Sequence, residues 1–309
     1  MKTLSILTVA ASMDTGSVIY ADQKGQVFSV IGNNTIFLES TDEHLTVLTS
    51  FLGRADDQDP VNYNEVTAIG NGKETVTGGG AGFNFTGGSG HYVVNGGDAA
   101  SSTISGGSGG GIFTGGYFTS PTLTNPDDGT PIKYGSNVIT AGLLGSTLVG
   151  AAYGTSLLIA NGQDRDVLMG VSGQDTLSGG SSTASNIFEG NAKEILAGSG
   201  NDTLIGGFAL NQVNSNQDDN TLSTESLTGG SGHDQFRFIS GEGLQFSIQD
   251  FTSGTDKVDL HGFSETAQQI VASATVAGGS TFLAIDGNTT ISLLGVAHLS
   301  AKDFTFSGS

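Results

Sequence analysis

Between Val76 and Gly116 the sequence reads VTGGGAGFNFTGGSGHYVVNGGDAASSTISGGSGGGIFTGG, and this stretch decides the fold. An apolar residue, one further residue and Gly-Gly recur in it every nine or ten residues. Self-similarity at a fixed short period is the signature of a repeat architecture. Glycine supplies the positive φ and close backbone approach that tight turns need, so the stretch predicts short strands separated by glycine turns. The apolar members of the repeat are Val76, Phe85, Val94, Ile104 and Phe113.

The same spacing resumes after an interruption near Pro121 to Pro131, where turn residues cluster. Each nonad supplies one turn and one very short strand, so two nonads make one coil of a parallel β-roll. Alternate strand residues point inward, and a single coil cannot bury its own apolar face, so stacking of coils provides the stability. The later apolar members of the repeat are Ile139, Leu148, Leu168, Leu177, Ile195, Leu204, Val213, Leu222, Leu227 and Phe236.

Composition limits the partners of the chain. Its 309 residues include 50 glycines, 36% are hydrophobic, and the formal net charge is −20. Ten Lys and Arg residues are too few for a phosphate-backbone ligand, so nucleic acid is excluded. An acidic chain suits hard divalent cations, which are held by carboxylate and carbonyl oxygen. There is no cysteine to form disulfides and no apolar run near the roughly 20 residues that span a bilayer, so we expect no membrane-spanning segment.

One nonad carries a complete calcium signature, Gly-Gly-x-Gly-x-Asp-x-apolar-x. It runs from Gly229 to Arg237 and reads GGSGHDQFR. Ala197 to Leu204 departs from the signature only at the first glycine, and Gly170 to Leu177 only at the second. Asp166-Val167-Leu168 keeps the aspartate and the apolar residue.

These nonads resemble the repeats of the RTX family, the hemolysin-type calcium-binding repeat proteins. The resemblance implies Ca²⁺ held between successive turns by aspartate carboxylates and backbone carbonyls, with same-side partners 18 residues apart. By that spacing Asp202 meets Asn220, beside Asp219, and Asp175 meets Lys193. The alternative is that these aspartates only cap their own turns. The metal-binding residues carried over are Asp166, Asp175, Asp202, Asp234, Gly200, Gly232, Asp219 and Asn220.

The earlier nonads lack the calcium aspartate. Its place is taken by Phe83, Tyr92, Ser102 and Gly111, so we expect no carboxylate-ligated calcium in that part of the roll.

The C-terminal part resembles the end of secreted proteins of the serralysin type. Ile248 to Leu260 looks like the linker that follows their RTX repeats, and Asp303 to Ser309 is similar to their uncleaved export signal. Together these resemblances cover roughly residues 160 to 309. They imply export of the unfolded chain by type I secretion machinery and a secreted, extracellular protein.

The sequence therefore predicts an all-β fold, a right-handed parallel β-roll or β-solenoid with flanking β regions. Residues 1–65 read as an N-terminal β cap or small β domain, with a separate domain as the alternative. A short signal peptide over residues 1–12 is less favoured than a buried first strand. The remaining boundaries place a calcium-free solenoid at 66–120, a loop insertion at 121–136, the calcium-binding roll at 137–240, and a capping and secretion-signal region at 241–309.

The sequence contains no convincing catalytic motif. The five histidines have no His-Glu-x-x-His spacing, so the serralysin-like tail arrives without its protease. Gly106 to Gly110 formally fits Gly-x-Ser-x-Gly but lies within the nonads, without the strand–turn–helix context of a nucleophile. Acidic pairs such as Asp56 with Asp57, or Asp127 with Asp128, are commoner as loop residues than as glycosidase carboxylates. We expect a protein that is not an enzyme.

The function that we expect is a calcium-binding structural protein of the cell surface or extracellular matrix, such as a surface-layer, filament or adhesin subunit. Its partners are calcium, further copies of itself or cell-surface polysaccharide, and the export machinery. One alternative is a polysaccharide-active epimerase or lyase, or a carbohydrate-binding module, on an RTX export cassette. A further alternative is an ice- or surface-binding solenoid that uses rows of threonine, such as Thr75, Thr77, Thr86 and Thr114.

Overall fold

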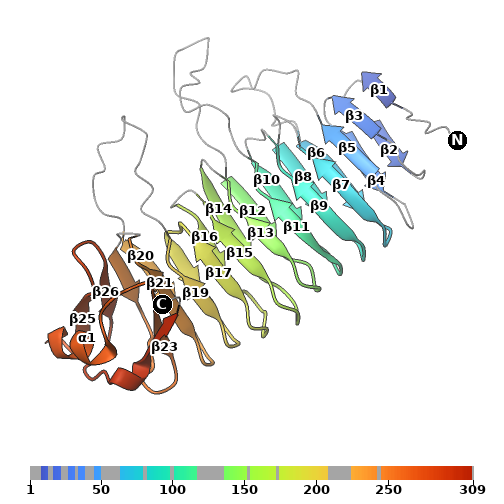
Figure 1. Ribbon diagram of the computed structural model, residues 1–309. Coiled ribbons are helices and arrows are strands. Elements are labelled where there is room, and N and C mark those ends of the chain that lie inside the picture. The colour runs from blue at the N-terminus through green and yellow to red at the C-terminus, as the bar shows by residue number, and fades with distance from the viewer. Residues whose placement is uncertain are drawn as a thin grey trace, which may run out of the picture. The chain divides into compact units, whose positions relative to one another are not determined.

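A computed structural model describes residues 63–307 except 79–81, 98–100, 117–135, 152–153, 172–173, 208–223 and 242–244; within residues 1–62 it describes the backbone of five strands. The chain divides into two compact units, Met1–Gly162 (unit 1) and Gln163–Ser309 (unit 2). In each unit the odd-numbered strands form one sheet and the even-numbered strands another, except that β25 of unit 2 belongs to the even-numbered sheet (Figure 1). We call these the odd sheet and the even sheet of that unit.

Unit 1 is built from two parallel sheets whose strands alternate along the chain. Its odd sheet has the order β1 (Thr8–Ser12), β3 (Val27–Ile31), β5 (Leu45–Thr49), β7 (Lys73–Thr77), β9 (His91–Asn95), β11 (Gly110–Thr114) and β13 (Thr147–Val149). Its even sheet has the order β2 (Ser17–Ala21), β4 (Asn34–Leu38), β6 (Tyr63–Ala68), β8 (Gly82–Thr86), β10 (Ser102–Ser105), β12 (Ser136–Thr140) and β14 (Thr155–Ile159).

Unit 2 repeats this arrangement and ends in an antiparallel hairpin. Its odd sheet has the order β15 (Val167–Gly170), β17 (Ile187–Gly190), β19 (Thr203–Ile205), β21 (Gln235–Ile239), β23 (Lys257–His261) and β27 (Phe304–Ser307). Its even sheet has the order β16 (Thr176–Ser178), β18 (Glu194–Leu196), β20 (Thr224–Thr228), β22 (Gln245–Ile248), β26 (Thr290–Leu293), β25 (Ser280–Ala284) and β24 (Thr275–Ala277).

One apolar residue per strand builds the core, because the coils stack in register. In the odd sheet of unit 1, Val76, Val94, Phe113 and Leu148 are consecutive register partners, each at most 1% exposed. Their chain neighbours alternate with them in burial, as the two-residue period of a strand requires. The matching row in unit 2 is Leu168, Phe188, Leu204, Phe236 and Val258, all fully buried.

The C-terminal end of unit 2 contains the helix α1 (Ala267–Ser273) and a short 3₁₀ turn at Ala301–Asp303. Thr266 begins α1 with a capping box, because its side chain accepts the amide of Gln269 and its own amide donates to the Gln269 side chain. Ala267 and Ile270 bury one side of the helix. Among the residues that the structure describes, no helix is long and apolar enough to cross a membrane.

The all-β parallel roll and its nonad periodicity are confirmed. The apolar positions named from the repeat are buried at 0–1% wherever they are described, whereas Val213 and Leu222 lie outside the described residues. The first strands, expected as an N-terminal β cap or small β domain over residues 1–65, continue the two sheets of unit 1, because β5 pairs with β7 and β4 pairs with β6. The loop insertion expected at 121–136 is outside the described residues except at Ser136.

Removing the buried aromatic ring of Phe113 should destabilise unit 1. Phe113 is fully buried, so Phe113→Ala leaves a cavity and should lower the free energy of unfolding by about 3–5 kcal/mol. The control Ile69→Ala changes a side chain that is 55% exposed in a turn and should shift stability by less than about 0.5 kcal/mol. Urea unfolding followed by circular dichroism measures both. Equal effects of the two substitutions would contradict the assigned core.

Candidate metal centre

A column of acidic side chains runs through the odd sheet of unit 2. Val167, Ile187, Thr203, Gln235 and Lys257 are consecutive register partners, so the residues immediately before them stack as well. Each stacked residue lies two positions before a core residue of the same strand. The column, which we call the aspartate column, consists of Asp166, Asn186, Asp202, Asp234 and Asp256.

Each side chain of the aspartate column closes a hydrogen bond to the preceding coil. The Asp166 amide donates to Asn186 Oδ1 over 3.0 Å, and the Asn186 amide donates to Asp202 Oδ1 over 2.8 Å. The pattern continues from the Asp202 amide to Asp234 Oδ1 at 2.9 Å and from the Asp234 amide to Asp256 Oδ1 at 3.1 Å. Asp202 and Asp234 therefore each use Oδ1 to accept a backbone amide, and Asp256 uses both of its oxygens, because Oδ2 also accepts the Thr252 amide at 2.8 Å.

Burial makes the column electrostatically costly. Asp166, Asp202 and Asp234 are at most 2% exposed, and Asp202 Oδ2 is buried with no hydrogen-bond partner among the described residues. Burial raises the pKa of Asp202 to about 7, and the charge of Asp234 adds to that rise against the Asn186 amide, which lowers it. Burial likewise raises the pKa of Asp234 to about 6, with further increases from Asp256 and Asp250. Ionised carboxylates in this column need a counter-charge.

The glycine turns before Asp202 and Asp234 stack directly on each other. Ser199 and Ser231 form a parallel bridge, in which the Gly200 amide donates to the Ser231 carbonyl at 3.0 Å and the Ser231 amide to the Gly198 carbonyl at 2.8 Å. Gly232 has a φ of 143°, and a Cβ atom there would overlap the Gly200 carbonyl oxygen. Glycine is required because the two turns approach each other this closely.

The donor set of these two turns fits a hard divalent cation. Asp202 and Asp234 supply carboxylates on stacked coils, one of them with an orphaned oxygen, and the turns bring backbone carbonyls beside them. Among the described residues no group of three or more His, Cys, Asp or Glu side chains converges as a metal site, so carbonyls would have to complete the coordination. Calcium, which accepts carbonyl ligands and a flexible geometry, suits such a set better than magnesium.

Only part of the predicted site lies in this column. Asp166, Asp202 and Asp234 stack there, with Gly200 and Gly232 in the adjoining turns. Asp175 lies on the even sheet, where its register partner is Lys193, as the 18-residue rule expected, and its Oδ2 accepts the Val171 amide at 2.8 Å. Asp219 and Asn220 lie outside the described residues.

The coil lengths correct the expected partner of Asp202. Successive members of the column are 20, 16, 32 and 22 residues apart, so the register partner of Asp202 is Asp234, 32 residues further on, whereas Asn220 lies outside the described residues. Sequence reasoning missed Asn186 and Asp256 because it assumed a constant 18-residue coil. The signal that identifies them is their place two residues before the buried residues Phe188 and Val258.

Unit 1 fills the same inward position mostly with neutral side chains. Tyr92 Oη accepts the amides of Gly88 and Gly90 at 2.9 and 3.0 Å. Asn137 exchanges two hydrogen bonds with the Gly116 backbone, each 3.2 Å long. Ser146 and Ser156 accept the amides of Gly142 and Ala151. These turns are closed by neutral hydrogen bonds, without carboxylates.

In the described part of unit 1, Glu74 places a carboxylate at this inward position, one coil before the residues that the sequence places there. It lies two residues before Val76 and is the register partner of Tyr92. The side chain is 1% exposed, and neither carboxylate oxygen has a hydrogen-bond partner among the described residues. Burial raises the pKa of Glu74 to about 7.

Two further acidic residues close the C-terminal end of unit 2. Asp250 accepts the Gly229 and Gly230 amides at 3.0 and 2.7 Å. Asp303 accepts the Gly254 amide and the Ser253 hydroxyl, each at 2.8 Å. Burial alone would raise the pKa of Asp303, but hydrogen bonds from Ser300, Ser253 and Gly254 outweigh it and hold the pKa below its usual value. The linker and the export-like segment are thus fastened to the roll.

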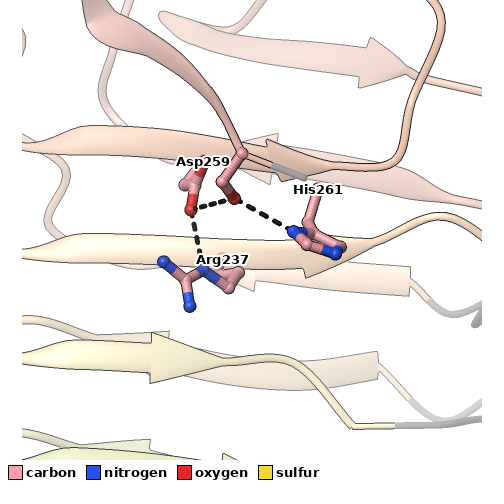
Figure 2. A network of polar contacts seen from close by, with 4 residues as sticks. Arg237, Asp259 and His261 are labelled. Atoms are coloured by element: carbon pink, nitrogen blue, oxygen red, sulfur yellow. Dashed lines mark hydrogen bonds and ion pairs between the residues drawn. The ribbon is translucent and has the colours of Figure 1, made fainter. Parts of the chain in front are cut away.

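A Ser, His and Asp cluster on the same unit is arranged for fastening strands and not for hydrolysis. Figure 2 shows Arg237 and His261 on either side of Asp259. Ser307 donates to Asp259 Oδ2 at 2.9 Å, beside Arg237 Nε at 2.7 Å, and lies 3.1 Å from His261 Nδ1. Because the one hydroxyl proton goes to the carboxylate, His261 Nδ1 must donate to Ser307, so it cannot act as its base. The cluster joins β21, β23 and β27.

Replacing a carboxylate of the aspartate column by an amide should have opposite effects with and without calcium. Asp202→Asn and Asp234→Asn keep an oxygen that accepts the backbone amide but lose the charge. In chelator, unit 2 should become more stable because buried like charges are removed. The calcium concentration that stabilises unit 2 should rise at least several-fold. Calcium titration followed by thermal unfolding measures both, and Asp164→Asn, on an exposed side chain, is the matched control.

Glu74 should make the stability of unit 1 depend on pH. A carboxyl group whose folded pKa is about 7 binds more protons in the folded state than in the unfolded one, so stability falls as pH rises from about 4.5 to 7. Glu74→Gln should remove this loss and stabilise unit 1 at pH 8 by on the order of 3 kcal/mol. Urea unfolding at pH 4 and pH 8 measures it. An unchanged pH profile in the variant would refute the assignment.

The sequence of residues 159–306 matches the family described as Peptidase M10 serralysin C terminal. Among solved structures, the extracellular lipase LipA from Serratia marcescens aligns with 85% of this chain at 16% identity and a TM-score of 0.23. The chain spans 45% of the length of that lipase. No curated protein sequence matches the chain significantly.

Proposed function

We propose that this chain, whose residues 159–306 are an RTX-type region of the serralysin C-terminal family, is a structural protein that folds on calcium outside the cell. The protein is secreted, because that region is the export and calcium-binding end of secreted proteins. The matched region is also the non-catalytic part of serralysins. The surface-layer, filament or adhesin role is the part that we add.

The aspartate column is the observation that carries the proposal. Asp202 and Asp234, with carbonyls of the turns before them, would hold the ion between stacked coils. When bound, calcium would supply the positive charge that the buried carboxylates lack. Because the column exists only when the coils are stacked, binding favours the folded state and adds stability by mass action.

Export and folding are then separated by the calcium concentration. Inside the cell calcium is scarce, the carboxylates repel one another, and unit 2 remains unfolded and competent for a type I channel. Outside, millimolar calcium stabilises the stacked coils. The C-terminal strand β27 becomes ordered in the same step, since Phe304 is 6% exposed and Asp303 is buried against residues 253 and 254.

A structural role is supported by the large part of the chain that forms the parallel roll. Most described strands belong to the parallel roll, and inward polar residues such as Asn137, Ser146 and Ser156 are engaged in closing turns. Outward faces of such sheets are regular and repeat from coil to coil, which suits lateral packing into arrays. We assign the chain no reaction of its own and place its function in assembly.

Hydrogen exchange with and without calcium tests the calcium-folding part of the proposal. In chelator at pH 7.5 we expect protection of the strands of unit 1 and rapid exchange in β15 to β23 of unit 2. Millimolar calcium should protect unit 2, whereas magnesium at the same concentration should not, because it demands a tighter octahedral site. Equal protection of unit 2 in chelator and in calcium would refute ion-driven folding.

Size-exclusion chromatography and electron microscopy in calcium test the structural part. We expect concentration-dependent oligomers or ordered arrays that dissolve in chelator. A strict monomer under both conditions would contradict the structural role while leaving calcium-driven folding intact.

A further inference from the structure

We propose that the outer face of the odd sheet in unit 1 is the surface on which a second copy of this chain packs. The inference rests on the proposed structural role and names the contact that would serve it. The face is defined by two rows of outward side chains on β7, β9, β11 and β13. The first row is Thr75, Val93, Ile112 and Thr147, and the second is Thr77, Asn95, Thr114 and Val149.

The lack of charged residues favours this surface over the rest of the chain as a contact between copies. The whole chain carries a formal net charge of −20, yet no described residue between Gly82 and Gly162 is Asp, Glu, Lys or Arg. The margin of the face holds Lys73 and His91, and its two rows contain no acid. Two copies that met through acidic surfaces would bring like charges together, whereas two copies that meet here do not.

The centre of the face is apolar and exposed. Val93 and Ile112 are register partners on neighbouring strands, so their side chains lie next to each other on the same side of the sheet. Val93 is 40% exposed and Ile112 is 45% exposed. Both are β-branched, and in sheets such side chains usually pack against neighbouring residues. Threonines flank them in the same row. A second such face can cover the pair without burying a charge.

A two-fold contact uses the same patch on both copies. A two-fold axis through the centre of the face would therefore place the Val93 and Ile112 pair of one copy against that of the other. Three strands of five residues and one of three span about 300 Å², less than the ~800 Å² per partner of a standard stable interface. The contact should therefore be weak between two free copies and become significant at high concentration or in an array.

Charge introduced at the centre of the face tests the inference. In the double variant Val93→Lys with Ile112→Lys, two cations face two cations across the two-fold axis, and desolvating them opposes association. Sedimentation velocity in calcium, over a wide concentration range, should show the dissociation constant raised at least ten-fold relative to the wild-type chain. The milder double variant Val93→Thr with Ile112→Thr keeps β-branched residues and should weaken association less.

The control Met169→Lys places the same charge on the odd sheet of unit 2, at a residue that is 36% exposed, and should leave association unchanged. Circular dichroism and the calcium dependence of hydrogen exchange should remain those of the wild-type chain in every variant. Oligomers formed equally by wild type and by both double variants would overturn the inference but leave the proposed function standing.

Two other outcomes also count against the inference. A wild-type chain that stays monomeric at every concentration in calcium would refute this contact together with the structural role. Variants that keep wild-type association but lose retention on an insoluble polysaccharide would show that the face binds a glycan and not a second copy.

Discussion

Stacking of coils in register is the constraint on which the rest of this structure depends. Because each strand lies directly on the strand two along the chain, one position of the nonad is superimposed on itself in every coil. An apolar residue there gives a continuous core row, and a glycine gives a turn that fits closely against the next turn. A carboxylate at the inward position before the core residue gives a column of like charge. The residue type at one position of the nonad therefore determines a continuous row of like side chains along the whole unit.

Because each inward position is repeated from coil to coil, a charged residue there has a different consequence from a neutral one, and the two units differ in this respect. Two carboxylates on coils ~4.8 Å apart repel each other by about 3–4 kcal/mol at an effective dielectric constant near 20. Unit 2 accepts this repulsion at Asp202 and Asp234 and so requires a cation or protons. Unit 1 places Tyr92, Asn137 and Ser146 at the same position and closes its turns with neutral groups. Under the proposed function, one backbone architecture would have a part whose folding depends on calcium and a part that folds without the ion.

The residues that follow the nonad period could be predicted from the sequence, whereas the pairing between coils of unequal length could not. Phe113 and Phe236 could be assigned to the core, and Asp234 to the inward acidic position, because each follows from the local nonad. The partner of Asp202 could not be assigned, because its coil is 32 residues long and a constant 18 was assumed. Glu74 was missed for a different reason: it follows a Gly-x-Gly turn, Gly70-Asn71-Gly72, but is a glutamate where the signature has aspartate. Local spacing fixes which residues point inward, whereas register between coils depends on how much chain each turn contains.

The C-terminal end shows how the same residues can serve export and folding at different times. In the folded chain Asp303 is fully buried and bonded to Gly254, Ser253 and Ser300, and β27 is paired with β23. The hydrogen bonds of Asp303 to Ser253 and Gly254 join segments 50 and 49 residues apart, so these two bonds exist only after the last coil has formed. Before that, the acidic residue and its phenylalanine neighbours are free for any receptor that reads an extended chain. Under the proposed function, the last step of folding would bury the segment that the export machinery recognises, so that a chain could be exported only before this step.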